Sequence, residues 1–270
     1  MSGPRPRILA MGGGGFTAGI EDSALDLFAL SQARRATPRI CLLPTAGGDA
    51  EAQIARFYAF FRRRACEPSH VSLFRLAGTG LDLRTHLMSQ DVIYVGGGSM
   101  MNLLAIWRAH GLDAVLRDAW QAGVVLCGLS AGSMCWFEHG ITTSTGHATP
   151  ARGLGFLAGS NSVHWSSEPA RRRAYRDAVG DGMPAGYGVD DGCALVFKGT
   201  RLHEVVAARP RAGAWRVEER DDEVLETPLD VRLLPTEDGG PLAQTPAEIL
   251  ELRAVRRGAE LVRRHARRVG

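Results

Sequence analysis

Four short apolar runs in the first half of the chain each end in a turn of small residues, and a helical pattern follows each turn. The runs and their turns are Arg7–Met11 with Gly12–Gly15, Arg39–Leu43 with Pro44–Asp49, Val92–Val95 with Gly96–Ser99, and Val124–Cys127 with Gly128–Gly132. Because strand, helix and strand joined in this order form right-handed crossovers, the alternation predicts parallel strands with helices on both faces. The sequence therefore predicts a doubly wound, mostly parallel α/β sheet of the flavodoxin-like type.

The predicted sheet brings the four turns to one edge, because ligand sites of such sheets lie off the carboxyl ends of the strands. Apolar residues at helical spacing predict the helices that cover the sheet. These helices are expected at about Ser23–Arg35, Ala50–Arg64, Met100–His110, Gly111–Ala122 and Ser133–Gly140.

The fourth turn has the pattern of a nucleophile elbow, with Ser130 between Gly128 and Gly132. Such a turn lifts the serine hydroxyl out of the sheet, and the glycines leave room for the neighbouring chain. The helix that follows directs its dipole and the amide of Ala131 at the same place, where an oxyanion could form. The alternative is a serine that only caps the helix, since this short pattern also occurs by chance.

Length and composition limit the remaining possibilities. The chain has 270 residues, of which 45% are hydrophobic and 23% are charged, as expected for one α/β domain over residues 1–235. A net charge of +3 is too small to indicate a nucleic-acid partner. The amino terminus lacks the pattern of a signal peptide and no apolar run is long enough to span a membrane, so we expect a cytoplasmic protein without a membrane partner.

The cysteines do not point to disulfides or to a metal site. There are five of them, and no two have the Cys-x-x-Cys spacing, so we expect free, buried thiols. Cys127 and Cys135 flank the elbow, but neither stands between its glycines. We therefore do not expect a cysteine nucleophile.

The second half of the chain predicts a basic helix and several short strands. The helix is expected at Pro169–Val179, and strands, mostly antiparallel, are expected at Tyr187–Val189, Ala194–Lys198, Leu202–Ala208, Trp215–Glu219 and Val231–Leu234. They would extend or cover one side of the sheet. Residues 236–270 are expected to form a charged helical appendage, with its helix at Pro246–Arg268; its arginines face solvent or, as an alternative, an acidic partner.

A serine nucleophile needs a base and an acid, and the second half of the chain offers candidates for both. His164 follows a short strand-like run and is the candidate base, although a loop or core histidine would fit the same position. Asp190 and Asp191 precede Gly192 at a strand end, where either carboxylate could orient the imidazole. An acidic turn without a catalytic role is the alternative.

The turn Gly96–Ser99 offers a second oxyanion donor, because consecutive glycines let backbone amides approach a ligand. The candidate amides are those of Gly97 and Gly98. A phosphate-binding loop is the alternative, but the chain lacks both the P-loop pattern and the dinucleotide fingerprint.

Taken in order, these motifs resemble the peptidase E family of serine peptidases, the aspartyl dipeptidases and their cyanophycinase relatives. The resemblance spans about residues 7–235 and rests on Gly12–Phe16, Leu43–Ala46, Tyr94–Ser99 with Asn102–Leu104, Gly128–Ser133, Val163–Trp165 and Asp190–Gly192. It implies a class I glutamine amidotransferase-like fold and a triad in the order Ser130, His164, Asp191. α/β-Hydrolases carry the acid before the histidine, and an amidotransferase would have cysteine at position 130.

The chain departs from the family pattern at a few positions. Ser99 stands where the family often has Asn, and Trp165 stands where Tyr or Phe is common. Asp191 replaces the usual Glu, which shortens its reach toward His164. No carboxylate stands near Thr145, where an acid has also been proposed for the family.

The resemblance implies a serine exopeptidase for small peptides, among them Asp-X dipeptides, that needs neither a metal nor a cofactor. In this family an arginine after the histidine is thought to bind the aspartyl side chain, and Arg171 and Arg172 lie in that region. A solvated basic helix is the alternative for these arginines. Alternative functions are hydrolysis of β-linked Asp-Arg polymer or dipeptides, and ligand binding without catalysis. We expect a monomer or a homodimer.

Overall fold

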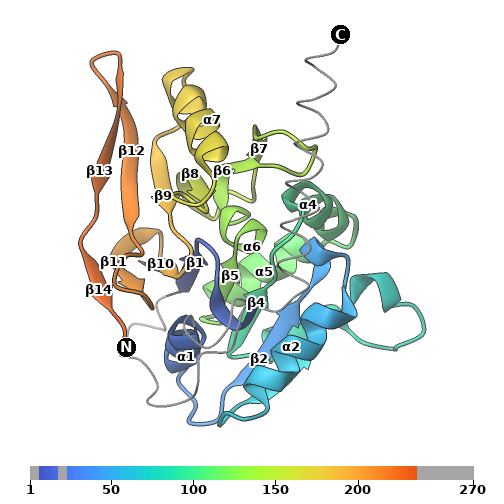
Figure 1. Cartoon of the computed structure of the whole chain (residues 1–270). Helices are drawn as coiled ribbons and strands as arrows, with labels where there is room; N and C mark the ends of the chain where they lie inside the picture. The colour runs from blue at the N-terminus through green and yellow to red at the C-terminus, as the bar shows by residue number, and fades with distance from the viewer. Residues whose placement is uncertain (1–5, 18–22, 236–270) are drawn as a thin grey trace, which may run out of the picture.

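The computed structural model describes residues 6–17 and 23–235 and contains two β-sheets (Figure 1). The larger sheet has the strand order β14-β11-β10-β1-β5-β4-β2-β3, and the smaller one has the order β13-β12-β9-β8-β6-β7. The predicted helical appendage at 236–270 lies outside the described residues.

Five parallel strands form one half of the larger sheet: the four that the apolar runs predicted, and β3, which the sequence analysis did not predict. They are β1 (Arg7–Met11), β5 (Val125–Leu129), β4 (Val92–Val95), β2 (Arg39–Leu43) and β3 (Glu67–His70). Three strands from the second half of the chain extend this sheet beside β1: β10 (Cys193–Lys198), β11 (Arg201–Ala207) and β14 (Val231–Leu233). The pairs β1 with β10 and β10 with β11 are antiparallel. The predicted fold class, a mostly parallel sheet with added antiparallel strands, is confirmed.

Helices cover both faces of this sheet, which explains why its central strands β1, β5, β4 and β2 are almost entirely apolar. Leu9 and Met11 of β1 pack into a cluster with α1 and α2, whereas Ile8 and Ala10 pack into another with α4 and α5. The helices are α1 (Ser23–Ser31), α2 (Glu51–Phe61), α3 (Leu83–Met88), α4 (Met100–Ala109) and α5 (Leu112–Gln121), with short 3-10 turns at Gly15–Thr17, Thr45–Gly47 and Leu73–Arg75. Successive residues of one strand thus serve two cores.

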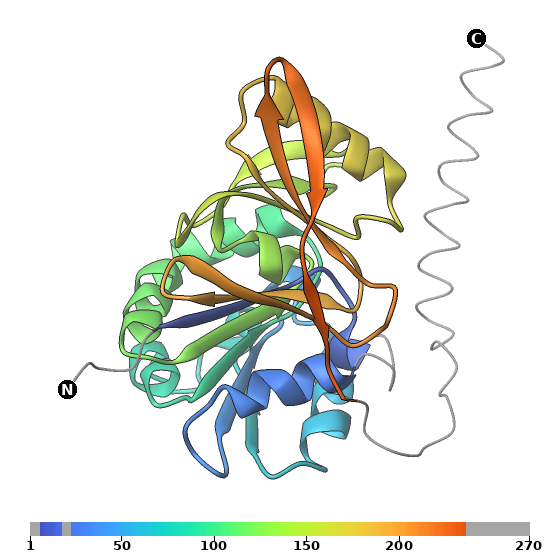
Figure 2. The same cartoon turned by 90° about the vertical axis from the view of Figure 1, so that its left-hand side faces the viewer.

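The smaller sheet was not predicted as a separate layer. Its strands are β6 (Phe137–Thr142), β7 (Thr149–Arg152), β8 (Leu157–Val163), β9 (Gly186–Val189), β12 (Ala214–Arg220) and β13 (Glu223–Pro228). Helix α7 (Pro169–Gly180) packs against it through Tyr175 and Val179, which contact Trp165 and Val217 in a third core. Figure 2 shows α7 and the hairpin β12–β13 at one end of the molecule.

The predicted helix at Ser133–Gly140 is wrong. Helix α6 covers only Ala131–Met134, and β6 begins three residues later at Phe137. Phe137 and Ile141 are four residues apart, a spacing that fits one face of a helix and also one face of a strand. Pairing of β6 with β7 and β8 selects the strand.

The described residues contain no helix of the length and apolar character needed to cross a membrane.

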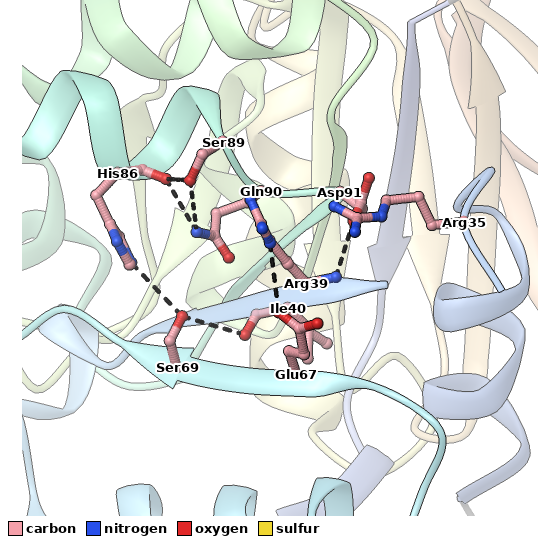
Figure 3. Close-up of polar contacts among 9 residues, drawn as sticks. All are labelled: Arg35, Arg39, Ile40, Glu67, Ser69, His86, Ser89, Gln90 and Asp91. Carbon is pink, nitrogen blue, oxygen red and sulfur yellow. Dashed lines mark hydrogen bonds and ion pairs between the residues drawn. The ribbon is translucent and has the colours of Figure 1, made fainter. Parts of the chain in front are cut away.

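A group of polar contacts secures the edge of the larger sheet where β2 and β4 begin (Figure 3). One carboxylate oxygen of Asp91 accepts the backbone N–H of Arg39 at 2.8 Å, and the N–H of Asp91 donates to the carbonyl of Arg39 at 2.9 Å. The Arg39 side chain pairs with Glu67 at 3.3 Å, with both side chains about half exposed. The reciprocal backbone contacts of Asp91 therefore fix the start of β2 against β4.

We expect Asp91→Ala to lower the free energy of unfolding by about 1–3 kcal/mol, because it leaves the Arg39 N–H without its charged acceptor. Glu67→Ala is the matched control from the same network, and it should cost no more than about 0.5 kcal/mol because exposed ion pairs contribute little. Urea unfolding of the two variants measures the difference. Equal losses would contradict this role of Asp91.

Candidate active site

Ser130 lies directly after β5 in a conformation that side chains rarely adopt. Its φ is 55° and its ψ is −113°, and its backbone N–H donates to the carbonyl of Met11 at 3.1 Å. Helix α6 begins at the next residue, yet the Ser130 side chain makes no capping hydrogen bond to it. The interpretation of Ser130 as a helix cap is therefore wrong, and the strained backbone is that expected of a nucleophile elbow.

The glycines of the elbow permit a close approach of three chain segments. A Cβ atom on Gly128 would overlap the carbonyl of Gly132, and one on Gly132 would overlap the carbonyl of Val95 in the neighbouring strand β4. Strand β5, helix α6 and strand β4 can therefore lie this close only because both residues lack side chains.

His164 lies between Ser130 and Asp191. Its Nε2 atom is 3.0 Å from the Ser130 hydroxyl oxygen, and its Nδ1 atom is 2.5 Å from Oδ1 of Asp191. Because an ionised carboxylate only accepts, the proton belongs on Nδ1, and Nε2 then accepts from the serine. The three side chains form a continuous hydrogen-bonded line, and the shorter Asp191 does reach the histidine.

The surroundings of Asp191 favour its charged form. Burial raises the pKa of this carboxyl. The hydrogen bond and charge of His164, the hydroxyl of Ser167 and the charge of Arg209 together lower the pKa by more than burial raises it. The net result is a pKa below the ordinary value for aspartate. Asp191 is therefore ionised at neutral pH and suited to stabilise an imidazolium.

Asp190 has a different set of contacts from its neighbour. It is 6% exposed, and its two carboxylate oxygens accept the backbone N–H groups of Ser166 at 2.9 Å and Gly213 at 3.0 Å. The residues alone left Asp190 and Asp191 as alternatives, and the family resemblance favoured Asp191. Asp191 points toward His164, whereas Asp190 connects the loop at Ser166 with the loop at Gly213.

The Gly96–Ser99 turn lies beside the elbow. A Cβ atom on Gly97 would lie 3.3 Å from the Cβ of Ser130, and one on Gly98, whose φ is 146°, would overlap the carbonyl of Ala46. Ser99 holds the turn, because its N–H donates to the Ala46 carbonyl at 2.8 Å and its hydroxyl caps α4.

The three predicted oxyanion donors differ in exposure, since Gly98 is exposed, Gly97 is half-buried and Ala131 is buried. Within residues 6–17 and 23–235, the hydrogen bonds found leave the backbone N–H groups of Gly97, Gly98 and Ala131 unused. Sequence analysis missed Gln53 of α2, whose amide donates to the Gly97 carbonyl at 3.5 Å and packs against Gly96. No local motif marks Gln53, because the helix packing alone brings it there.

The two predicted substrate-binding arginines are held by neighbours on α7 and in the smaller sheet. Arg171 is buried, donates to the Thr143 hydroxyl at 3.0 Å and pairs with Glu168 at 3.2 Å. Arg172 pairs with Glu226 of β13 and lies over the ring of Trp165, 5.1 Å from its centroid. Arg171 and Arg172 thus have structural contacts whatever else they bind.

The cysteines are free, as expected. Cys127 and Cys135 are buried beside the elbow, and burial raises the pKa of each thiol well above its ordinary value. Neither is a thiolate at neutral pH, so neither is suited to act as a nucleophile. The described part of the chain has no cluster of His, Cys, Asp and Glu that could hold a metal ion.

Comparisons with known proteins bear on the family and on the fold. The model of peptidase family S51 matches residues 8–205. An uncharacterized peptidase of Bacillus subtilis strain 168, YgaJ, is 46% identical over 229 residues, which are 84% of this chain and 99% of YgaJ. Two solved structures share the fold at low identity: a peptidase from an acI-B1 actinobacterium and a putative peptidase E from Listeria monocytogenes EGD-e.

The actinobacterial structure aligns with a TM-score of 0.59 at 18% identity and covers 86% of this chain and 97% of its own. The Listeria structure aligns with a TM-score of 0.53 at 16% identity, with coverages of 74% and 97%.

We expect Asp190→Asn to lower the free energy of unfolding by about 1–3 kcal/mol, because one carboxylate oxygen becomes an N–H₂ group facing a backbone donor. Asp191→Asn, at the more exposed neighbouring position, should change stability less. Denaturant unfolding of both variants at pH 7 compares them. A larger loss for Asp191→Asn would contradict the assignment of Asp190 as the structural aspartate.

Proposed function

Because the chain belongs to peptidase family S51, we propose that it is a serine exopeptidase that hydrolyses small peptides through Ser130, His164 and Asp191. The observation that carries this proposal is the hydrogen-bonded line, at 3.0 Å from Ser130 to His164 and 2.5 Å from His164 to Asp191. We further propose that the enzyme acts in the cytoplasm and that residues 1–235 contain the whole activity.

The proposed reaction is acyl transfer to the serine followed by hydrolysis. The Ser130 hydroxyl attacks the scissile carbonyl while Nε2 of His164 takes its proton. The imidazolium then protonates the leaving amine, and Asp191, charged beside Nδ1, stabilises it throughout. Water next attacks the acyl-enzyme with His164 again as base, which releases the acid product and restores Ser130.

The proposed oxyanion hole consists of the amides of Ala131 and of Gly97 or Gly98. Ala131 is the first residue of α6, so its N–H has no carbonyl partner within the helix. Gly97 lies against Ser130, where a Cβ atom would be 2.7 Å from the Leu129 side chain and 3.3 Å from the Cβ of Ser130, so the backbone can lie this close only because the residue is glycine. Hydrogen-bond donors that are already in position before the reaction stabilise the negative charge that develops on the carbonyl oxygen in the transition state.

We propose Arg171 as the residue that recognises an acidic side chain of the substrate. It is a buried cation in the first turn of α7, seven residues after His164. Its partner Thr143 lies in the loop whose Ser144 accepts the N–H of Met101, at the start of α4. These contacts support a position of the Arg171 side chain between His164 and the Gly96–Ser99 turn.

We expect Ser130→Ala to reduce peptide turnover by a factor on the order of 10⁴ or more while the fold is retained. A fluorophosphonate probe should label the wild-type protein at Ser130 and leave this variant unlabelled. Ser166→Ala, which removes an exposed hydroxyl near the site, is the control and should be labelled like wild type. Undiminished hydrolysis by Ser130→Ala would refute the proposal, and absence of labelling in wild type would favour a ligand-binding role.

We expect Arg171→Met to lower kcat/KM for Asp-X dipeptides by roughly 100-fold, because a charged hydrogen bond to the substrate is lost. Hydrolysis of Ala-X dipeptides should change much less. Arg173→Met, at an exposed position on the same helix, is the matched control. A panel that includes β-linked Asp-Arg substrates tests the alternative specificity, and equal loss on all substrates would argue against recognition by Arg171.

A further inference from the structure

Ser167 makes a hydrogen bond to Asp191 that has no role in the proposed reaction as described above. Its hydroxyl donates to Oδ2 of Asp191 at 2.8 Å, while His164 occupies Oδ1 at 2.5 Å. In the described part of the chain, each oxygen of the proposed catalytic carboxylate has one side-chain hydrogen bond, and the charge of Arg209 also acts on this group. Both hydrogen-bond partners come from the same short segment, since Ser167 follows His164 by three residues.

The turn after His164 brings this hydroxyl into place. His164 has a φ of 56°, and its carbonyl accepts the N–H groups of Ser167 at 3.1 Å and Glu168 at 2.8 Å. Trp165 anchors the turn from inside, where it is 1% exposed. The tight turn reverses the chain before α7 begins at Pro169, so Ser167 faces the carboxylate.

The usual role of a serine near a helix start does not explain this arrangement. The residue in the N-cap position of α7 is Glu168, and no side chain caps the helix there. Among the described residues, the one other hydrogen-bond acceptor found for the Ser167 hydroxyl is the carbonyl of His164, at 3.4 Å. One hydroxyl proton serves one strong bond, and the nearer, ionised acceptor takes it.

We infer that Ser167 is a positioning residue that holds the Asp191 carboxylate in the plane that faces His164, an inference that rests on the proposed function. The last torsion of an aspartate side chain is broad, so a single partner at Oδ1 leaves the carboxylate free to rotate. A second partner at Oδ2 fixes both oxygens. Because Ser167 is exposed, water can partly replace its hydroxyl. We therefore expect loss of this hydroxyl to lower the rate much less than loss of Asp191.

Kinetics of three variants test this inference. Ser167→Ala should lower kcat by about tenfold at unchanged KM, the effect of roughly 1.4 kcal/mol on the barrier when a charged hydrogen bond is only partly replaced. Ser167→Thr keeps the hydroxyl and should restore most of the rate. Ser166→Ala, which removes the adjacent exposed hydroxyl, should match wild type, and unfolding midpoints of all three should agree with wild type.

A spectroscopic measurement tests the same contact without an assay of turnover. In protein labelled with ¹⁵N-histidine, the Nδ1 proton of His164 should give a downfield ¹H resonance that Asp191→Asn removes. Ser167→Ala should shift or broaden this resonance, and Ser166→Ala should leave it unchanged. A merely structural role for Ser167 would not move the resonance while the unfolding midpoint stays constant.

The two measurements separate failure of this inference from failure of the proposed function. If wild type neither hydrolyses peptides nor reacts with the fluorophosphonate probe, the proposed function fails, and the resonance alone decides whether Ser167 orients Asp191. If wild type is active but Ser167→Ala matches Ser166→Ala in kcat and in the resonance, the positioning role is overturned.

Discussion

The proposed site depends on the close contact between Gly12 and Gly13, which follow β1, and the segment Asp190–Cys193. The contact is possible because Gly12 and Gly13 have no side chains. The N–H of Gly12 donates to the carbonyl of Cys193 at 2.9 Å, and the N–H of Gly192 donates to the carbonyl of Gly13 at 3.0 Å. A Cβ atom on Gly13 would overlap Asp191 and lie 2.8 Å from the imidazole of His164. The first strand of the larger sheet therefore fixes the acid and leaves room for the base, which come from loops that end two strands of the smaller sheet.

Backbone strain is placed at two of the three proposed catalytic residues. Ser130 and His164 are among the few described residues other than glycine with positive φ, at 55° and 56°. Such conformations typically cost on the order of 1–3 kcal/mol each and persist only where neighbouring contacts hold them. The Met11 carbonyl holds the amide of Ser130, and two amides hold the carbonyl of His164. In both cases a strand ends abruptly and its next side chain points into the site.

The sequence predicts the larger sheet well because each central strand is buried on both faces and is therefore a continuous apolar run. It predicts the smaller sheet poorly, since β8 reads Leu-Ala-Gly-Ser-Asn-Ser-Val and carries buried polar residues such as Asn161. The order of Ser130, His164 and Asp191 could also be predicted from motifs. The residues alone left Asp190 and Asp191 open, and only the family resemblance favoured Asp191, because the contact that marks Asp190 as structural is a donor at Gly213, 23 residues further along the chain. The same holds for Arg172, whose partner Glu226 is 54 residues away.

A common arrangement links these local features. Each proposed catalytic residue stands next to a buried anchor in the chain: Ser130 follows Leu129, His164 precedes Trp165, and Asp191 follows Asp190. Leu129 packs into the core beneath the larger sheet, and Trp165 packs against Tyr175 and Trp215 in the core of the smaller one. At Ser130 and His164 the positive φ ends the strand direction, so the buried neighbour holds the chain in the core while the catalytic side chain turns toward the site. The hydrogen-bonded line therefore depends on three buried residues in different surroundings, and a substitution at Leu129, Trp165 or Asp190 acts first on the catalytic residue beside it in the chain.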